Sequence, residues 1–235
     1  MSSDKTLDKV KKLRELTGVG FKDCKNAIDE NNGDIEKSIE FLRKKGIAKA
    51  TKRMGRTAAE GLVCIYESKN KFSMIEINSE TDFVAKNSEF INFAEEVSHL
   101  ALEVSGKMDD ILKSKMINKK NVEQNLIDLV SKIGEKITIR KSACFSNDKL
   151  LNFSYTHASI KKNIGKIGVL LSVETQKNKH DVMNLGKQLA MQIASSTPLA
   201  IDKEGLDQNI LKKEKEIITE ELKNSGKNSK IVEKI

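Results

Sequence analysis

Two carboxylates lie close together in the sequence, at Glu80 and Asp82, and paired carboxylates can act as a general acid and a general base. They follow a run of strand-forming residues and precede a run of helix-forming residues. No histidine or other candidate base lies near them in the sequence. The structural alternative is that Asp82 caps the helix while Phe83 packs into the core. The residues alone favour this alternative, because Asp is common at helix starts.

The segment Gly18-Val19-Gly20 is the second candidate for a chemical site, since glycine pairs occur in phosphate-binding loops. It lies between two expected helices, follows no expected strand and lacks a third glycine. A tight turn between helices is therefore the favoured interpretation. The sequence contains no HExxH, GxSxG or Walker motif, so it predicts a protein that is not an enzyme.

The three cysteines and three histidines are too scattered to predict a disulfide framework or a metal site. They are Cys24, Cys64, Cys144, His99, His157 and His180. We expect the cysteines to be small buried hydrophobic residues in a reducing compartment. The start MSSDKTLDKV resembles neither a secretory signal nor a transit peptide, and no apolar stretch is long enough to span a bilayer. These features predict a cytoplasmic location.

The formal net charge is +8, from 42 basic and 34 acidic residues, which is compatible with a protein that binds RNA. A basic run, Lys49, Lys52, Arg53 and Arg56, lies within the segment 47–60, which we interpret as a partly helical linker. However, nearly all the basic residues are Lys, whereas Arg is the usual residue for reading bases and clamping phosphates. A solvated Lys-rich surface is the favoured interpretation.

Residues 1–46 predict three short helices that pack as one bundle, since such helices are marginal alone. The first ends at Gly18, the second at 31–33, and the third runs from Asp34 as N-cap to Gly46. The apolar residues at helical spacing are Leu7, Val10, Leu13 and Leu16, then Phe21, Cys24, Ala27 and Ile28, then Ile35, Ile39 and Leu42.

The remainder predicts an α+β core in which a strand hairpin followed by a helix occurs twice. Strands are expected at 62–68, 71–79, 137–145, 150–157 and 164–174. Helices are expected from Asn87 or Ser88 onward, at 121–133, and through 182–193 up to Thr197-Pro198, whereas 106–120 is expected to be loose. We interpret the repetition as two related halves.

The last segment is charge-rich with an apolar seam, which is typical of one arm of a helical hairpin or coiled coil. The seam residues are Ile210, Leu211, Ile217, Ile218 and Leu222, and apolar residues return at Ile231, Val232 and Ile235. A helix that stops on an apolar residue without a cap is expected to continue beyond the given sequence.

Several segments carry a resemblance to one protein family. LRELTGVGFKDCKNAIDENNGDIEKSIEFLRKKG (13–46) and INSETDFVAKNSEFINFAEEV (77–97) resemble the two signatures of bacterial elongation factor Ts. IGEKITIRKSA (133–143), SYTH (154–157), KIGVLLSVE (166–174) and MQIASSTP (191–198) follow the same family in order. The resemblance runs from about Val10 to the end of the chain.

The resemblance implies a guanine nucleotide exchange factor that binds elongation factor Tu with GDP and promotes GDP release. It also implies four segments. These are a ubiquitin-associated-like module at 1–54, core halves at 55–136 and 137–204, and an incomplete coiled-coil hairpin at 205–235. The chain would need no cofactor, because Mg²⁺ and GDP belong to the partner. A heterodimer or a dimer of heterodimers is expected, with no contact to nucleic acid or membrane.

The resemblance also implies contact residues, residue by residue. Thr81, Asp82, Phe83 and Val84 match the stretch associated with dislodging the partner's Mg²⁺. A docking role for the N-terminal module falls on Leu13, Arg14, Thr17, Gly18, Val19 and Gly20. His157 matches a second contact, for which a strand-end histidine bonded to a carbonyl is an equal alternative. The chain departs from the family at Ala158 and in a longer loop at 159–163.

Overall fold

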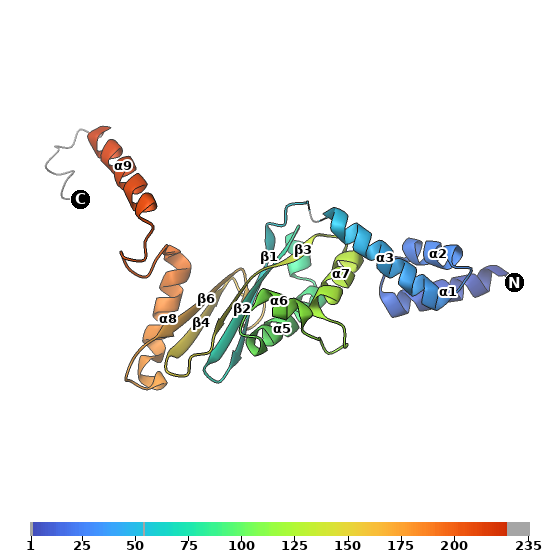
Figure 1. The fold of residues 1–235 in the computed structure, drawn as a ribbon, viewed down its shortest axis with the longest axis horizontal. Helices are drawn as coiled ribbons and strands as arrows, with labels where there is room; N and C mark the ends of the chain where they lie inside the picture. The colour runs from blue at the N-terminus through green and yellow to red at the C-terminus, as the bar shows by residue number, and fades with distance from the viewer. Residues whose placement is uncertain (1, 54, 225–235) are drawn as a thin grey trace. The chain divides into compact units, whose positions relative to one another are not determined.

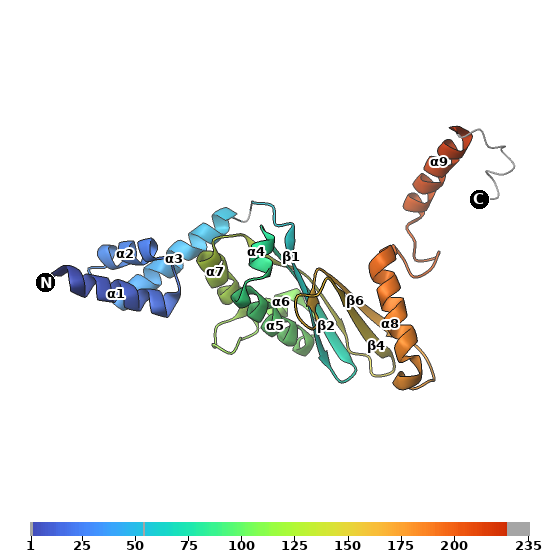
Figure 2. The ribbon, with the colours of Figure 1, turned by 180° about the vertical axis from the view of Figure 1, so that it is seen from behind.

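The computed structural model describes residues 2–53 and 55–224 (Figures 1 and 2). It combines helices with antiparallel strands, which confirms the α+β class. The chain divides into two compact units, Met1–Ala194 and Ser195–Ile235. None of the described helices is long and apolar enough to cross a membrane.

Three helices form the N-terminal module: α1 (Ser2–Thr17), α2 (Phe21–Glu30) and α3 (Ile35–Arg53). Gly18 ends α1 at φ +65°, and the Asp34 side chain accepts the backbone N–H of Lys37, as a cap should. Their shared core consists of Val10, Leu13, Cys24, Ala27, Ile28 and Leu42. The expected apolar stripes are therefore only partly correct, because Leu7, Leu16, Phe21 and Ile39 are exposed.

Helix α3 does not end at Gly46 as expected but continues to Arg53. It continues because it packs along α7 (Val122–Ile133). Gly46 lies against Ser131, where a Cβ atom would be 3.0 Å from the Ser131 Oγ, and Arg53 donates to the Val130 carbonyl at 3.1 Å. Most of the expected linker is therefore helix.

The main sheet has the order β3-β2-β1-β5 and is antiparallel throughout. Its strands are β1 (Glu60–Ser68), β2 (Lys71–Ser79), β3 (Ile137–Phe145) and β5 (Ile164–Gly165). The hairpin of β1 and β2 is confirmed, with Glu60 opposite Ser79 and Ser68 opposite Lys71. Because β3 pairs with β2, the boundary expected between residues 136 and 137 does not separate two sheets. As domains, the four expected segments stay a prediction.

Helices α5 (Ser88–Glu103), α6 (Met108–Lys113) and α7 cover one face of this sheet (Figure 1). Asn87 caps α5 by accepting the backbone N–H groups of Glu89 and Phe90, as expected. The expectation that 106–120 is loose is wrong, because α6 buries Ile111 completely and Met116 follows it into the core. A helix of six residues is too short to show a helical period, which explains the miss.

The opposite face of the sheet carries a two-stranded sheet of β4 (Leu151–His157) and β6 (Ile167–Val173), with α8 (Lys179–Ser196) beyond it (Figure 2). Gly168 lies so close to β1 and β2 that a Cβ atom would be 2.6 Å from Val63. Gly186 likewise lies against the Phe153 ring of β4. The strand expected at 164–174 is split at Lys166, since its first part pairs with β1 and its second with β4.

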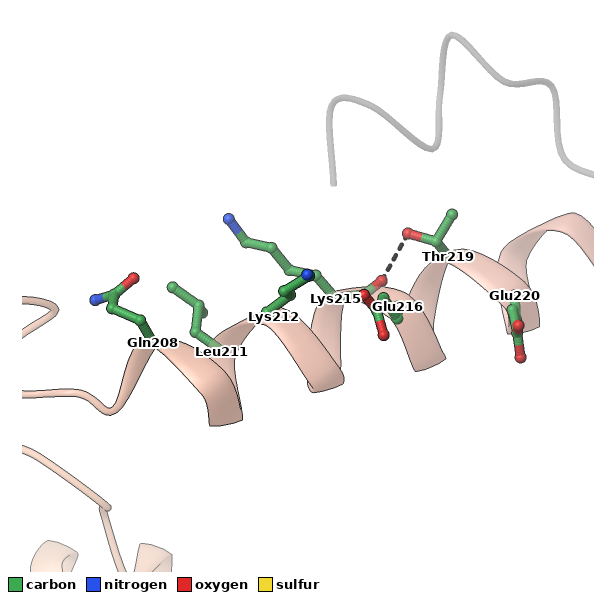
Figure 3. A pocket seen from close by; sticks show the side chains of 7 residues that line it. All are labelled: Gln208, Leu211, Lys212, Lys215, Glu216, Thr219 and Glu220. Carbon is green, nitrogen blue, oxygen red and sulfur yellow. Dashed lines mark hydrogen bonds between the residues drawn. The ribbon is translucent and has the colours of Figure 1, made fainter.

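Helix α9 (Gln208–Asn224) belongs to the second unit. Figure 3 shows one of its faces, along which a shallow hollow is lined by side chains of this helix alone. Ile210, Ile217 and Ile218 of the expected seam are 41–45 % exposed, and the expected apolar return at 231–235 lies outside the described residues. Pairing of α9 in a coiled coil therefore stays a prediction.

Candidate functional site

The turn that follows β2 is built around a single helical turn, α4 (Asp82–Ala85). Thr81 is its N-cap residue, with φ −124° and ψ 159°, and the Thr81 carbonyl accepts a hydrogen bond from the Ser79 hydroxyl at 2.9 Å. We call residues 81–84 the tip. The structural alternative that Asp82 is the cap is therefore wrong.

The tip divides its side chains sharply between core and solvent. Val84 is 5 % exposed and Ala85 is fully buried, and both belong to the core cluster beneath α5. Phe83 is 79 % exposed. The expectation from the residues alone, that Phe83 packs into the core, is wrong. One turn of helix presents only one side to the sheet, and Val84 and Ala85 occupy that side.

A carboxylate from a distant segment holds the tip at its first residue. Thr81 donates its backbone N–H to Glu135 Oε2 at 2.9 Å and its hydroxyl to Glu135 Oε1 at 2.7 Å. Glu135 lies between Gly134, which ends α7 in the left-handed region at φ +91°, and the start of β3. Two parallel hydrogen bonds to one carboxylate fix both distance and direction.

Glu80, the residue before the tip, binds in the opposite direction, to the connection that carries Glu135. Glu80 Oε1 accepts the backbone N–H of Lys136 at 2.6 Å, and both its oxygens accept from Arg56 Nη1, at 3.2 and 3.3 Å. The bond from the Lys136 N–H, with help from Arg56, lowers the pKa of the Glu80 carboxyl. Lys136 in turn donates its ammonium to the Arg56 carbonyl at 2.8 Å. Three segments are thus tied together beside the tip.

Glu80 and Asp82 do not form an acid–base pair. Asp82 pairs with Lys86 at 2.9 Å, one turn along, and this hydrogen bond lowers the pKa of the Asp82 carboxyl. A general acid needs a carboxyl pKa raised toward neutrality, whereas both pKa values here are lowered. Acid–base catalysis by Glu80 and Asp82 therefore has no support from the geometry.

The N-terminal residues divide into supports and exposed groups. Leu13 is fully buried, and the Thr17 hydroxyl donates to its carbonyl at 2.7 Å. Gly18 needs its positive φ and lies against Lys132 of α7, which pairs with Glu89. Arg14 and Gly20 are exposed, and Thr17 and Val19 are half-buried. Arg14, Thr17, Val19 and Gly20 are therefore accessible to a partner, whereas Leu13 and Gly18 shape the turn.

His157 is exposed at the end of β4, away from the tip in the sequence and on a different sheet. Its Nδ1 lies 3.1 Å from the Tyr155 hydroxyl, so its ring partner is a hydroxyl and not the carbonyl considered from the sequence. The loop that follows is tied to β1, because the Asn163 carbonyl accepts the backbone N–H of Ile65 at 2.9 Å.

The cysteines are all free thiols. Cys24 and Cys64 are buried as expected, but Cys144 is only half-buried, because β3 lies at the edge of the sheet. Within residues 2–53 and 55–224, no group of three or more His, Cys, Asp or Glu side chains is placed to hold a metal ion.

Comparison with known proteins identifies the family. A family model described as elongation factor TS matches residues 80–235. Elongation factor Ts of Nitrobacter hamburgensis is 42 % identical over 226 residues, which is 96 % of this chain and 73 % of the relative. Elongation factor Ts of Bartonella henselae is 43 % identical over 231 residues, which is 98 % of this chain and 75 % of the relative. The chain belongs to the elongation factor Ts family.

The part that matches the elongation factor Ts family model begins at Glu80 and contains the whole tip, Glu135 and His157. The resemblance drawn from the sequence signatures is thereby confirmed. Signals in the sequence point to the tip but not to Glu135, which holds Thr81, nor to Arg56, which holds the neighbouring Glu80. A glutamate after a helix-ending glycine is unremarkable, and nothing in the sequence links it to Thr81.

Proposed function

We propose that this chain is a guanine nucleotide exchange factor that binds elongation factor Tu with GDP and promotes GDP release during translation elongation. The family, with its printed name of elongation factor, supports the class of protein. The observation that carries the proposal is the exposure of Phe83 at 79 %, beside Val84 and Ala85 in the core. A large aromatic side chain held outward on a firmly anchored turn is typical of a protein–protein interface, where aromatic residues are enriched.

The proposed mechanism acts on the partner's Mg²⁺ and phosphate site. Mg²⁺ demands near-ideal octahedral oxygen geometry, so a small displacement of its surroundings weakens the bound nucleotide. Phe83 serves as a wedge that displaces side chains beside that site. Asp82 brings a negative charge, because an aspartate carboxyl is ionised at neutral pH even without its pair to Lys86. Its exposed pair with Lys86 is weak enough to exchange for a partner contact.

Exchange then follows from linkage. If binding of the chain lowers the GDP affinity of elongation factor Tu by some factor, GDP must lower the affinity for the chain by the same factor. Because most losses of affinity appear as faster dissociation, GDP leaves the complex faster, and a new nucleotide then displaces the chain. No bond of the nucleotide is broken, so the chain is not an enzyme in the usual sense, and Mg²⁺ and GDP stay the partner's ligands.

The remaining elements are assigned supporting roles in the proposal. The three-helix module acts as a ubiquitin-associated-like docking domain through Arg14, Thr17, Val19 and Gly20. His157 provides a second contact, α9 forms one arm of a coiled-coil hairpin, and the protein works in the cytoplasm as a heterodimer or a dimer of heterodimers.

RNA binding, the alternative suggested by the charge of +8, gains no support from the basic run. Arg53 donates to the Val130 carbonyl, and Arg56 binds Glu80. Two arginines of that run thus have partners within the protein, where they stabilise the fold beside the tip. An RNA-binding surface would instead leave such groups free for phosphates.

The test is release of a fluorescent GDP analogue from elongation factor Tu, followed by stopped flow. Substoichiometric amounts of the chain should accelerate release, and the Phe83→Ala and Asp82→Ala proteins should do so less. The tip is the wrong site if both single variants and the double variant match the wild type. If the wild-type chain itself has no effect, the proposed function fails.

A further inference from the structure

We propose that Glu135 is a positioning residue for nucleotide exchange, because it fixes the direction in which the tip presents Phe83. This inference rests on the proposed function above. Glu135 lies on the connection between α7 and β3, 54 residues from Thr81 along the chain. Its contact with the tip is made through Thr81, so it acts on the partner only indirectly.

Phe83 has little packing of its own to hold it in place, since 79 % of it is exposed. Its direction must therefore come from the backbone on either side. After it, Val84 and Ala85 are anchored in the core. Before it, Thr81 is held at both its N–H and its hydroxyl by the Glu135 carboxylate. Two bonds to one residue restrain rotation as well as position, which a single bond does not.

The neighbouring contact of Glu80 makes the arrangement reciprocal. Glu135 accepts from the tip backbone at Thr81, and Glu80 accepts from the backbone next to Glu135, at Lys136. Arg56 holds Glu80 from a third segment. Loss of the Glu135 carboxylate leaves the Glu80 contacts and the core anchors intact. We therefore expect the Glu135→Ala protein to fold, with a tip that is loosened rather than lost.

A loosened tip has a specific consequence for exchange. The rest of the docking surface still binds elongation factor Tu, but the Phe83 side chain points in the required direction for a smaller fraction of the time. The factor by which the chain and GDP weaken each other should fall at least about tenfold in Glu135→Ala, since one charge-assisted hydrogen bond alone is worth about that factor and two are lost. Glu135→Gln can still accept the Thr81 N–H and donate to its hydroxyl oxygen, so it should recover most of that loss.

The experiment measures the affinity of the full chain for elongation factor Tu with and without GDP, and takes the ratio of the two dissociation constants. Partial unfolding of a variant lowers both apparent affinities equally and leaves the ratio unchanged. The variants are Glu135→Ala, Glu135→Gln, Thr81→Val and the Thr81→Val/Glu135→Ala double variant. Glu123→Ala is the matched control, since it removes an exposed glutamate from the first turn of α7.

We expect the double variant to resemble Glu135→Ala alone, because Thr81→Val removes only the hydroxyl bond, which Glu135→Ala already removes together with the bond from the Thr81 N–H. Glu123→Ala should keep the wild-type ratio. The inference is overturned if Glu135→Ala keeps the wild-type ratio. That includes the case in which it weakens both affinities by the same factor, as expected of a residue that only contributes to docking. It is also overturned if the Thr81 and Glu135 effects simply add. If the wild-type chain itself has equal dissociation constants with and without GDP, the proposed exchange function is refuted.

Discussion

Replacing Phe83 by alanine should leave the free protein almost unaffected. Burying a phenylalanine side chain completely contributes about 1.5–3 kcal/mol. Phe83 is 79 % exposed, so only about a fifth of that contribution is made in the free chain. We therefore expect the substitution to cost about 0.3–0.6 kcal/mol and to lower the melting temperature by about 1–2 °C.

The same substitution should have a much larger effect on the complex. If the partner covers the rest of Phe83, the remaining four-fifths of the burial is worth about 1.2–2.4 kcal/mol. That corresponds to a loss of about 7- to 50-fold in affinity for nucleotide-free elongation factor Tu. Thermal unfolding by circular dichroism and titration of the nucleotide-free partner measure the two effects separately.

Phe90→Ala is the matched control, because it removes the same side chain from a fully buried position on α5. It should cost about 3–5 kcal/mol of stability. A Phe83→Ala protein as strongly destabilised as Phe90→Ala would contradict the exposed position of Phe83. A Phe83→Ala protein that binds nucleotide-free elongation factor Tu as tightly as the wild type would refute the role of the tip.

Four further outcomes follow from the burial of Cys64, the backbone strain at Gly61 and the hydrogen bonds of Glu80. Burial raises the pKa of the Cys64 thiol to about 11. Iodoacetamide at pH 8 should therefore modify half-buried Cys144 before Cys64, and equal modification rates of the two thiols would contradict this expectation. Since the folded thiol keeps its proton longer than the unfolded one, Cys64 should also make stability, measured by urea unfolding, fall as the pH rises from about 9 to 11. Gly61→Ala should lower stability by about 1–3 kcal/mol in the same assay, because φ is +135° and a Cβ atom would lie 2.1 Å from the Ile77 carbonyl oxygen. Gly55→Ala is the matched control, and it should be nearly neutral because a Cβ atom there meets open space. The pKa of Glu80 is lowered in the folded chain, so its contribution to stability is complete above its ordinary pKa and is lost as the pH falls through the lowered value. Hydrogen exchange at the Lys136 amide, taken relative to its intrinsic rate, should therefore rise only when the pH falls below the ordinary pKa of Glu80.

Local signals in the sequence predicted most of the elements. Two runs of strand-forming residues separated by a short polar turn predicted the hairpin of β1 and β2, and Asn87 marked the start of α5. The same local signals could not predict which strands pair. The strand at 137–145 joins β2 instead of the strand that follows it, because pairing depends on packing between distant segments. Helix α3 similarly passes Gly46 because α7 lies beside it, a contact absent from any local window.

The tip shows the same division between local and distant information. Family signatures in the sequence pointed to residues 81–84, but helical periodicity did not reveal that Phe83 is exposed while Val84 is buried. That outcome depends on how a one-turn helix sits on the sheet. Glu135 was not predictable at all, since its only relation to Thr81 is a contact across 54 residues.

The most direct test of the central claim compares wild-type chain and Phe83→Ala in GDP release from elongation factor Tu, with Mg²⁺ present and with Mg²⁺ removed by EDTA. If the tip acts by disturbing the Mg²⁺ site, wild-type chain should accelerate release well beyond Phe83→Ala when Mg²⁺ is present. Without Mg²⁺ the two proteins should give nearly equal rates, because the step that Phe83 assists is already complete. An advantage of the wild type that is as large in EDTA as in Mg²⁺ would contradict the account.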